Sequence, residues 1–297
     1  MNVTTTIRTA TQDDIEALFE LFCKMDAAEI GSPMTTKTDV QNLLEESDIG
    51  SWVAVVDTQI VAFGSLRTLS KPKELRAQFG CLPEYLNAAS MILEWLISYA
   101  RAYDVYEISL WQLTGGIAVP CLHEAGWAPM RRYLRMGLEL TKPWSKTIAI
   151  GKDIVVRQAV GVADLQLVHK LIEETLADHW DHHHLDFDTF MSTQAARPGH
   201  DLSLWYIASF ANQPAGAIVG RLEESKGQIA LLGALEQFRG RGVAIALLSK
   251  AFHDLENRGA TKVTLDVDTD NATNAVRVYE KVGMKIEFSS EQWKIQI

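Results

Sequence analysis

The chain has 297 residues, of which 47% are hydrophobic and 22% are charged, and its formal net charge at pH 7 is −10. This length and composition are typical of a globular protein with two domains of about 150 residues each. The acidic balance argues against a general nucleic-acid-binding protein, which would carry a basic domain or stripe. We therefore expect a small molecule or peptide as partner, and neither nucleic acid nor membrane.

The cysteines and the apolar runs indicate a compartment. Cys23, Cys81 and Cys121 are widely spaced and form no CxxC pair, so they predict neither a disulfide framework nor a zinc ribbon. The first residues lack a basic segment followed by an apolar one, and no apolar run approaches the roughly 18 residues that span a bilayer. We expect a cytoplasmic protein, either a monomer or a homodimer.

Segments of the first half recur in the second half in the same order. The recurring pairs are 7–22 with 156–172, 52–66 with 205–220, and 124–140 with 281–297. Their steady order indicates an internal duplication. The polar stretch 141–153, which contains Pro143 and Gly151, places the boundary at about residue 150. The predicted domains are therefore 1–150 and 151–297.

The expected elements of the second half follow from hydrophobic periodicity and from turn and cap residues. In chain order they are a strand over 153–160, helices over 163–177 and 186–195, strands over 203–210, 214–223 and 228–236, a helix over 241–258, a strand over 262–268, a helix over 272–282 and two strands from 284. They predict an α/β fold with a mixed, largely antiparallel central sheet flanked by helices.

The segment 177–188 is rich in histidine and acidic residues. It contains His179, His182, His183 and His184, and imidazole and carboxylate groups are proper zinc ligands. Adjacent histidines on a regular helix cannot all converge on one ion, and the cysteines are distant. We expect no metal here, and solvated loop histidines are the simplest interpretation.

The segment 235–248, "LEQFRGRGVAIALL", has the pattern of a strand, a tight glycine loop and a helix. Glycines let the main chain approach a phosphate, the helix N-terminus adds partial positive charge, and two arginines add full charges. A surface turn with a glycine cap is the plain alternative. A P-loop is excluded by the missing GK[S/T], and a Rossmann fingerprint by Ile245 in place of a small residue and by the roughly fifty residues that follow.

Two motifs in register carry a family resemblance. R-G-R-G-V-A at 239–244 resembles the R/Q-x-x-G-x-G/A signature of the GNAT acetyltransferase superfamily, whose loop holds the pyrophosphate of acetyl-CoA. The segment 265–284 resembles the family's strand, Asn, helix and "YE-x-x-GF" pattern, with Met284 where Phe is commoner. The duplicated layout is similar to tandem GNAT proteins such as mycothiol synthase, which implies two GNAT-like domains.

The resemblance implies acetyl-CoA as the co-substrate and a set of residues that hold it. The glycine loop would contact the pyrophosphate, and the strand before it, with Gly233 as a bulge or ligand approach, would contact the pantetheine arm. Backbone N–H groups near Ala234 and Leu235 would stabilise the oxyanion. The implied cofactor-binding residues are Leu232, Gly233, Ala234, Arg239, Gly240, Arg241, Gly242, Val243, Ala244, Asn271, Asn274 and Arg277.

Candidate catalytic residues follow from the same resemblance. Tyr279 matches the family's general acid, although helical spacing also places it in a core stripe with Ala275, Val278 and Val282. Gln228 stands where family members often carry a glutamate base. Glu223 and Glu224 are the nearby substitutes, although both lie at a predicted hairpin turn, where solvated acids are the default. His179 and Trp180 follow the first helix of the domain and are candidate acceptor contacts, with His179 a possible base.

The expected activity is transfer of acetyl from acetyl-CoA to a primary amine of a small molecule or peptide by direct attack. A CoA-binding pseudoenzyme or sensor is the first alternative, and a nucleotide-linked oxidoreductase is a remote one. In the first half, the counterpart of the glycine loop falls near 81–96, which contains neither glycine nor arginine. We expect the first domain to be degenerate, without CoA, and to contribute packing and one wall of the acceptor cleft.

Overall fold

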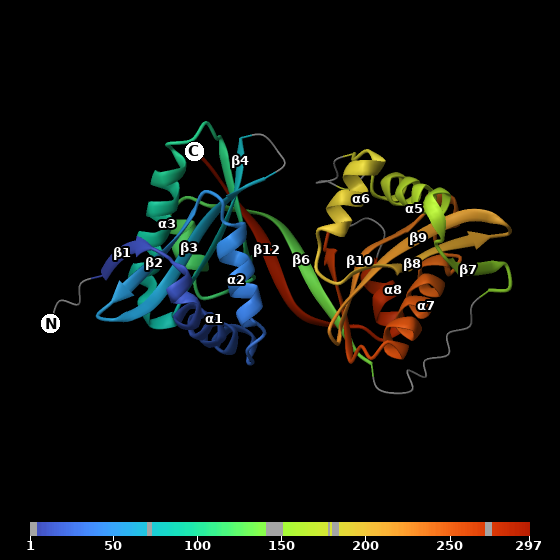
Figure 1. The fold of residues 1–297 in the computed structure, drawn as a ribbon, viewed down its shortest axis with the longest axis horizontal. Coiled ribbons are helices and arrows are strands. Elements are labelled where there is room, and N and C mark those ends of the chain that lie inside the picture. The colour runs from blue at the N-terminus through green and yellow to red at the C-terminus, as the bar shows by residue number, and fades with distance from the viewer. Residues whose placement is uncertain (1–4, 70–72, 141–150, 178, 180–183, 271–274) are drawn as a thin grey trace. The chain divides into compact units, whose positions relative to one another are not determined.

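The structure is a computed structural model that describes residues 5–69, 73–140, 151–177, 179, 184–270 and 275–297. The chain forms two compact units, shown in Figure 1. The N-terminal unit comprises Met1–Tyr133 with Phe288–Ile297, and the C-terminal unit comprises Leu134–Glu287. Each unit therefore includes a segment from the other half of the sequence.

The N-terminal unit is built on a mixed sheet with strand order β1-β2-β3-β4-β5-β12. Its pairs are antiparallel except for the parallel pair β4 and β5. Helix α3 packs on one face, where Ile92 and Leu96 meet Gly64, and α1 packs against the core around Phe63. In chain order, the elements up to residue 140 are β1 (Thr5–Thr9), α1 (Ile15–Ile30), α2 (Lys37–Glu46), β2 (Gly50–Val56), β3 (Gln59–Thr68), β4 (Glu74–Cys81), α3 (Leu86–Ala100), β5 (Glu107–Leu113), α4 (Val119–Glu124) and β6 (Ala128–Glu139). Strand β12 (Lys285–Gln296) supplies the remaining strand of this sheet, and β6 continues into the C-terminal unit.

The C-terminal unit has strand order β6-β11-β10-β9-β8-β7, with β10 and β11 parallel. Its helices cover both faces: Thr175 of α5 contacts the sheet at Gly233, and Leu255 of α7 contacts it at Gly227. The elements are β7 (Ile154–Gln158), α5 (Gly161–Leu176), α6 (Phe187–Ala195), β8 (His200–Phe210), β9 (Gln213–Glu223), β10 (Lys226–Ala234), α7 (Val243–Asn257), β11 (Lys262–Asp268), α8 (Ala275–Val282) and β12 (Lys285–Gln296).

These elements confirm the predicted fold class. One prediction was wrong: the chain from 284 forms a single strand, β12, in place of two. Ser289 and Ser290 suggest a turn, but both are extended, because the Ser289 carbonyl accepts the Thr114 N–H and Ser290 pairs with Leu113. The predicted boundary near residue 150 falls in 141–150, outside the described residues.

Both halves begin with the same ion pair. Arg8 donates to the carboxylate of Asp14 through Nη1 and Nη2, and Arg157 does the same to Asp164. Each aspartate also accepts a backbone N–H from the turn before the helix. The hydrogen bonds from Arg157 lower the pKa of Asp164 to about 2. The duplication is thus visible in side-chain contacts as well as in strand order.

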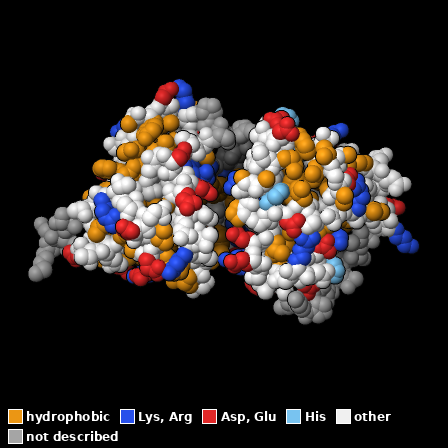
Figure 2. Space-filling view, viewed as in Figure 1, with side chains coloured by type: hydrophobic (Ala, Val, Ile, Leu, Met, Phe, Trp, Pro, Cys, Tyr) orange, Lys and Arg blue, Asp and Glu red, His pale blue; other side chains and the backbone are white. Residues whose placement is uncertain are grey.

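The charged side chains on the face shown in Figure 2 are interspersed, with acidic and basic groups lying among one another. This distribution agrees with the net charge of −10 and shows no basic field on that face. Among the helices that the structure describes, none is long and apolar enough to cross a membrane.

Candidate functional site

The site forms where β10 loses its pairing with β11. The parallel ladder joins Lys226–Gln228 to Lys262–Thr264 and continues no further between these two described strands. On its other side, β10 stays paired with β9 as far as Ala234, with an irregularity between Ile229 and Leu231. Backbone groups on the β11 side of 229–234 are therefore open to a ligand that hydrogen-bonds like a strand.

The packing of α5 against β10 explains why residue 233 is a glycine, and the sequence did not reveal this reason. A Cβ at this position would stand 1.9 Å from the Thr175 hydroxyl oxygen, so helix α5 requires the glycine. The strand irregularity lies at Ile229 and Leu231 and not at Gly233. The predicted bulge therefore exists a few residues earlier, and Gly233 lets α5 approach the open end of β10.

The loop between β10 and α7 presents backbone N–H groups. Gly240 and Gly242 have φ values of +76° and +92°, which favour glycine. Gly242 is the N-cap of α7 and has no side chain to accept hydrogen bonds from the first turn. The N–H groups of Val243 and Ala244 therefore lack intrahelical partners and point out of a positive helix end. This geometry suits an anion such as a phosphate.

The two arginines of the loop are held in different ways. The Nε of Arg239 donates to the carbonyl of Ala234 at 3.4 Å, which ties the loop to the end of β10. The guanidinium of Arg241 lies over the Phe210 ring, 4.9 Å from its centroid. Both side chains are exposed, so their charges remain available beside the helix N-terminus.

One of the backbone groups expected to stabilise an oxyanion is already used. The N–H of Leu235 donates to the carbonyl of Ala215 at 2.9 Å, so it is not available to a ligand. The oxyanion expectation now rests on the N–H groups of the unpaired edge of β10, up to Ala234.

Helix α8 carries Arg277 on its exposed side and Tyr279 on its buried side. Tyr279 is 9% exposed and belongs to the core of the C-terminal unit. Burial raises the pKa of its phenol to about 12, so the group stays neutral over the physiological range. The predicted residues Asn271 and Asn274 lie outside the described residues.

His179 pairs with an aspartate that the sequence did not single out. Its Nε2 lies 3.6 Å from Oδ2 of Asp268, whose side chain is 2% exposed. The other carboxylate oxygen of Asp268 accepts the N–H of Asp270 at 2.9 Å. Asp268 ends β11, so the last turn of α5 contacts the open end of β10 through Thr175, and His179 just after the helix contacts the end of β11. The sequence signal that could have identified Asp268 is an acidic residue at the end of an apolar strand.

The rest of the histidine segment is only partly described. Trp180, His182 and His183 lie outside the described residues. His184 directs Nδ1 toward Oε2 of Glu173 at 2.7 Å. Within the described ranges, no group of three histidine, cysteine or acidic side chains is placed to hold a metal ion.

Glu223 lies at the wrong end of its hairpin for a role beside the loop. It pairs with Lys226 at the start of β10, whereas Ala234 at the end of β10 pairs with Gly216. The eight steps from Lys226 to Ala234 span about 26 Å of strand. The structure therefore does not bring the exposed Glu223 to the glycine loop.

The N-terminal unit has the strand arrangement without the loop. Its β4 and β5 also pair only at their starts, from Glu74 to Arg76 on β4. Four residues, 82–85, then lead into α3, whereas eight residues, 235–242, lead into α7. The shorter connection contains no glycine and begins its turn with Pro83. It offers no equivalent of the phosphate-type loop.

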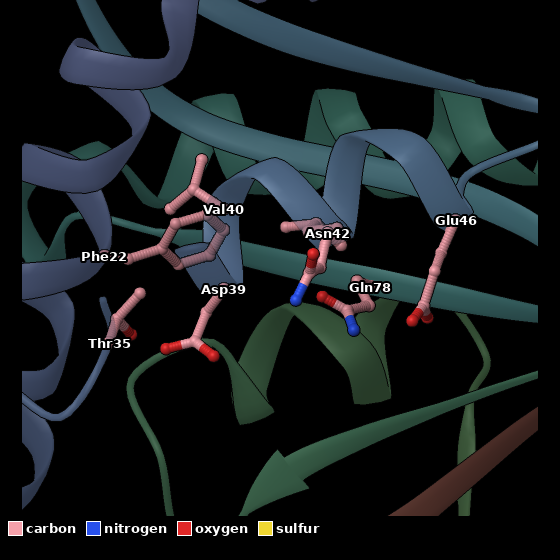
Figure 3. A pocket seen from close by; sticks show the side chains of 8 residues that line it. Phe22, Thr35, Asp39, Val40, Asn42, Glu46 and Gln78 are labelled. Atoms are coloured by element: carbon pink, nitrogen blue, oxygen red, sulfur yellow. The ribbon is translucent and has the colours of Figure 1, made fainter. Parts of the chain in front are cut away.

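A separate polar pocket of about 320 Å³ lies in the N-terminal unit (Figure 3). Side chains of α1, α2, the loop between them and β4 form its walls. The lining residues are Phe22, Thr35, Asp39, Val40, Asn42, Leu43, Glu46 and Gln78. None of them was predicted as a site residue.

The chain is similar to known proteins of the acetyltransferase (GNAT) family, both in its second half and over its whole length. Residues 165–284 match the model of the acetyltransferase (GNAT) family, so the predicted resemblance is confirmed. A GCN5-related N-acetyltransferase from Sphaerobacter thermophilus superposes with a TM-score of 0.85 at 21% identity, over 98% of this chain and 95% of that one. A tandem GNAT protein from the clavulanic acid biosynthesis pathway gives 0.69 at 11% identity, over 99% and 98%. At these identities, the structures show a shared tandem GNAT fold.

Proposed function

We propose that this chain, in which residues 165–284 form a domain of the acetyltransferase (GNAT) family, transfers an acetyl group from acetyl-CoA to an amine. The observation that carries the proposal is the combination of the open edge of β10 with the glycine loop at its end. An extended pantetheine arm fits a strand edge, and a pyrophosphate fits a helix N-terminus flanked by Arg239 and Arg241.

The proposed acceptor is a small-molecule or peptide amine, and His179 is the proposed proton acceptor. The neutral imidazole takes a proton from the amine while the amine nitrogen attacks the thioester carbonyl. Asp268 orients the ring through its contact with Nε2. The carbonyl oxygen gains negative charge, which N–H groups on the unpaired edge of β10 stabilise. When the C–S bond breaks, the CoA thiolate leaves and takes up a proton.

Tyr279 is the proposed proton donor to the departing thiolate. Its buried phenol holds the proton at every physiological pH, since its pKa is raised to about 12. The pKa of an ordinary phenol, about 10, is closer to that of a thiol, about 8.5, than the raised pKa of Tyr279 is. Proton donation from Tyr279 to the thiolate is therefore less favourable than donation from an ordinary phenol. Packing in the core is a second reason for a tyrosine at this position.

A CoA-binding protein without catalysis is the second candidate function. The observation in its favour is that Gln228, at the place where a glutamate base was expected, has no acid–base capacity and bonds to Arg221 instead. The two candidates differ in whether acetyl-CoA is consumed.

Release of CoA thiol from acetyl-CoA in the presence of a panel of amines tests the proposal. We expect thiol release by the parent chain, and a loss of about 100-fold or more in kcat for His179→Gln with an unchanged affinity for acetyl-CoA. Asp268→Asn should show an intermediate loss.

The matched control is His253→Gln, which changes an exposed histidine of α7 on the opposite face of the sheet. It should behave like the parent chain. Binding of acetyl-CoA without thiol release for any amine would favour the non-catalytic candidate, and equal rates for the parent chain and His179→Gln would remove His179 from the mechanism.

A further inference from the structure

An arginine on β9 lies half-buried without an acidic partner. Nη2 of Arg221 donates to Oε1 of Gln194 at 2.6 Å, and Nη1 donates to Oε1 of Gln228 at 3.4 Å. Both acceptors are neutral amides. The Nε of Arg221 is buried and has no hydrogen-bond partner. Among the residues that the structure describes, no carboxylate forms an ion pair with this guanidinium.

The surroundings of Arg221 add further donors and another positive charge. His200 and Gln228 are its register partners on the two neighbouring strands, so the three side chains share one face of the sheet. Nδ1 of His200 is also buried without a partner. The exposed Arg197, in the turn after α6, acts with burial to lower the pKa of Arg221, burial being the larger cause.

This arrangement is unfavourable for a guanidinium that has no acidic partner. A guanidinium removed from water without a countercharge loses hydration free energy that two amide oxygens recover only in part. A second arginine nearby increases the repulsion. Because the side chain keeps some exposure, an anionic ligand can reach it and replace the lost hydration.

We propose that Arg221 binds a carboxylate of the acceptor, so that the acceptor substrates are amines that also carry a carboxylate, such as amino acids or short peptides. This inference rests on the proposed function. Arg221 and Gln194 lie on the face of the sheet that α5 and α6 cover, at the end of β10 that is still paired with β11.

The position of Arg221 also limits the size of the acceptor. Gln228, which faces Arg221, lies four residues from Leu232 on the open edge, or about 13 Å along the strand. An acceptor whose amine reaches the open edge while its carboxylate reaches the long arginine side chain therefore has several bonds between the two groups. A dipeptide or a long amino acid fits this span better than glycine.

The variant Arg221→Met separates ligand binding from a structural role. Methionine fills similar space without charge, so the variant should unfold at the same or a higher temperature, whereas a structural arginine would lower it. With succinate as a carboxylate probe, the parent chain should show a rise in unfolding temperature that Arg221→Met lacks. Arg67→Met is the matched control, because Arg67 is likewise the ninth residue of its strand, β3, and its Nε is likewise buried without a partner.

Kinetics with dipeptides and their C-terminal amides test the substrate class. For the parent chain, KM should be roughly 10- to 100-fold lower for the free carboxylates than for the amides, and Arg221→Met should remove this difference. KM for acetyl-CoA should not change. Equal KM values for both series, or a succinate effect that persists in Arg221→Met, would overturn the proposal. A succinate effect without thiol release would leave the carboxylate site standing while the proposed transferase activity fails.

Discussion

Tyr279 illustrates how one residue combines packing with a proposed chemical role. We predict that Tyr279→Phe leaves affinity for acetyl-CoA unchanged and lowers kcat by about 100-fold, because only the proton donor is lost. The free energy of unfolding should change by less than about 1 kcal/mol, since the ring stays in place. Because the pKa of the phenol is raised to about 12, Tyr279 remains protonated below that pH. The alkaline limb of the rate profile should therefore be the same in both proteins.

The outcome that contradicts this role is an unchanged kcat in Tyr279→Phe. In that case, packing in the core would alone explain why a tyrosine occupies position 279. Lost affinity for acetyl-CoA at constant kcat would instead assign the hydroxyl to binding.

At the residue scale, the sequence predicted those site residues that belong to a local pattern. The glycine-loop pattern together with the family resemblance predicted Gly240 and Gly242, and both residues have the positive φ values of a tight glycine loop. Asp268 and Arg221 were missed because their surroundings come from distant parts of the chain. Asp268 contacts His179, which follows α5, and Arg221 on β9 contacts Gln194 on α6. Single-sequence patterns contain no information about such pairs.

At the element scale, the close approach of α5 to β10 gives a stability prediction. Gly233→Ala places a Cβ 1.9 Å from the Thr175 hydroxyl oxygen, so α5 must move away from the open end of β10. We expect a loss of about 1–3 kcal/mol in the free energy of unfolding, measured by denaturant titration. Affinity for acetyl-CoA should fall as well, because α5 helps to enclose the strand edge.

The double variant Gly233→Ala with Thr175→Ala is the internal check for this steric argument. Removing the hydroxyl relieves the shortest contact and should restore part of the stability. Additive losses in the double variant would show that the two residues do not contact each other in this way.

The predicted elements of the C-terminal unit match the observed ones because their periodicity is strong and their ends are marked. The strand 262–268 was placed correctly at both ends, and the helix predicted over 241–258 is α7, Val243–Asn257, with Gly242 as its N-cap. The end of the chain was predicted less well. Strand β12 continues through Ser289 and Ser290 because β5 supplies a pairing partner, which local sequence cannot show.

At the scale of the whole molecule, the duplicated halves have diverged in one functional feature. Both units keep a parallel strand pair that ends early, and both keep the Arg–Asp pair at the start. Of the two described connections, the one in the C-terminal unit has eight residues and two glycines of positive φ, whereas the one in the N-terminal unit has four residues. Each unit also contains a strand segment from the other half, a pairing that the sequence of one half cannot predict.

Calorimetric titration of the full chain with acetyl-CoA measures whether the glycine loop of the C-terminal unit binds the co-substrate. We expect one acetyl-CoA per chain, because one unit has the loop. Gly242→Val should lose at least 10-fold in affinity, since it distorts the N-terminus of α7 at a φ of +92°. Gly259→Val creates the same backbone strain at a φ of +90° beyond the other end of α7 and should bind like the parent chain. Two sites per chain, no binding at millimolar acetyl-CoA, or equal affinities of the two variants would show that the glycine loop of the C-terminal unit is not the acetyl-CoA site.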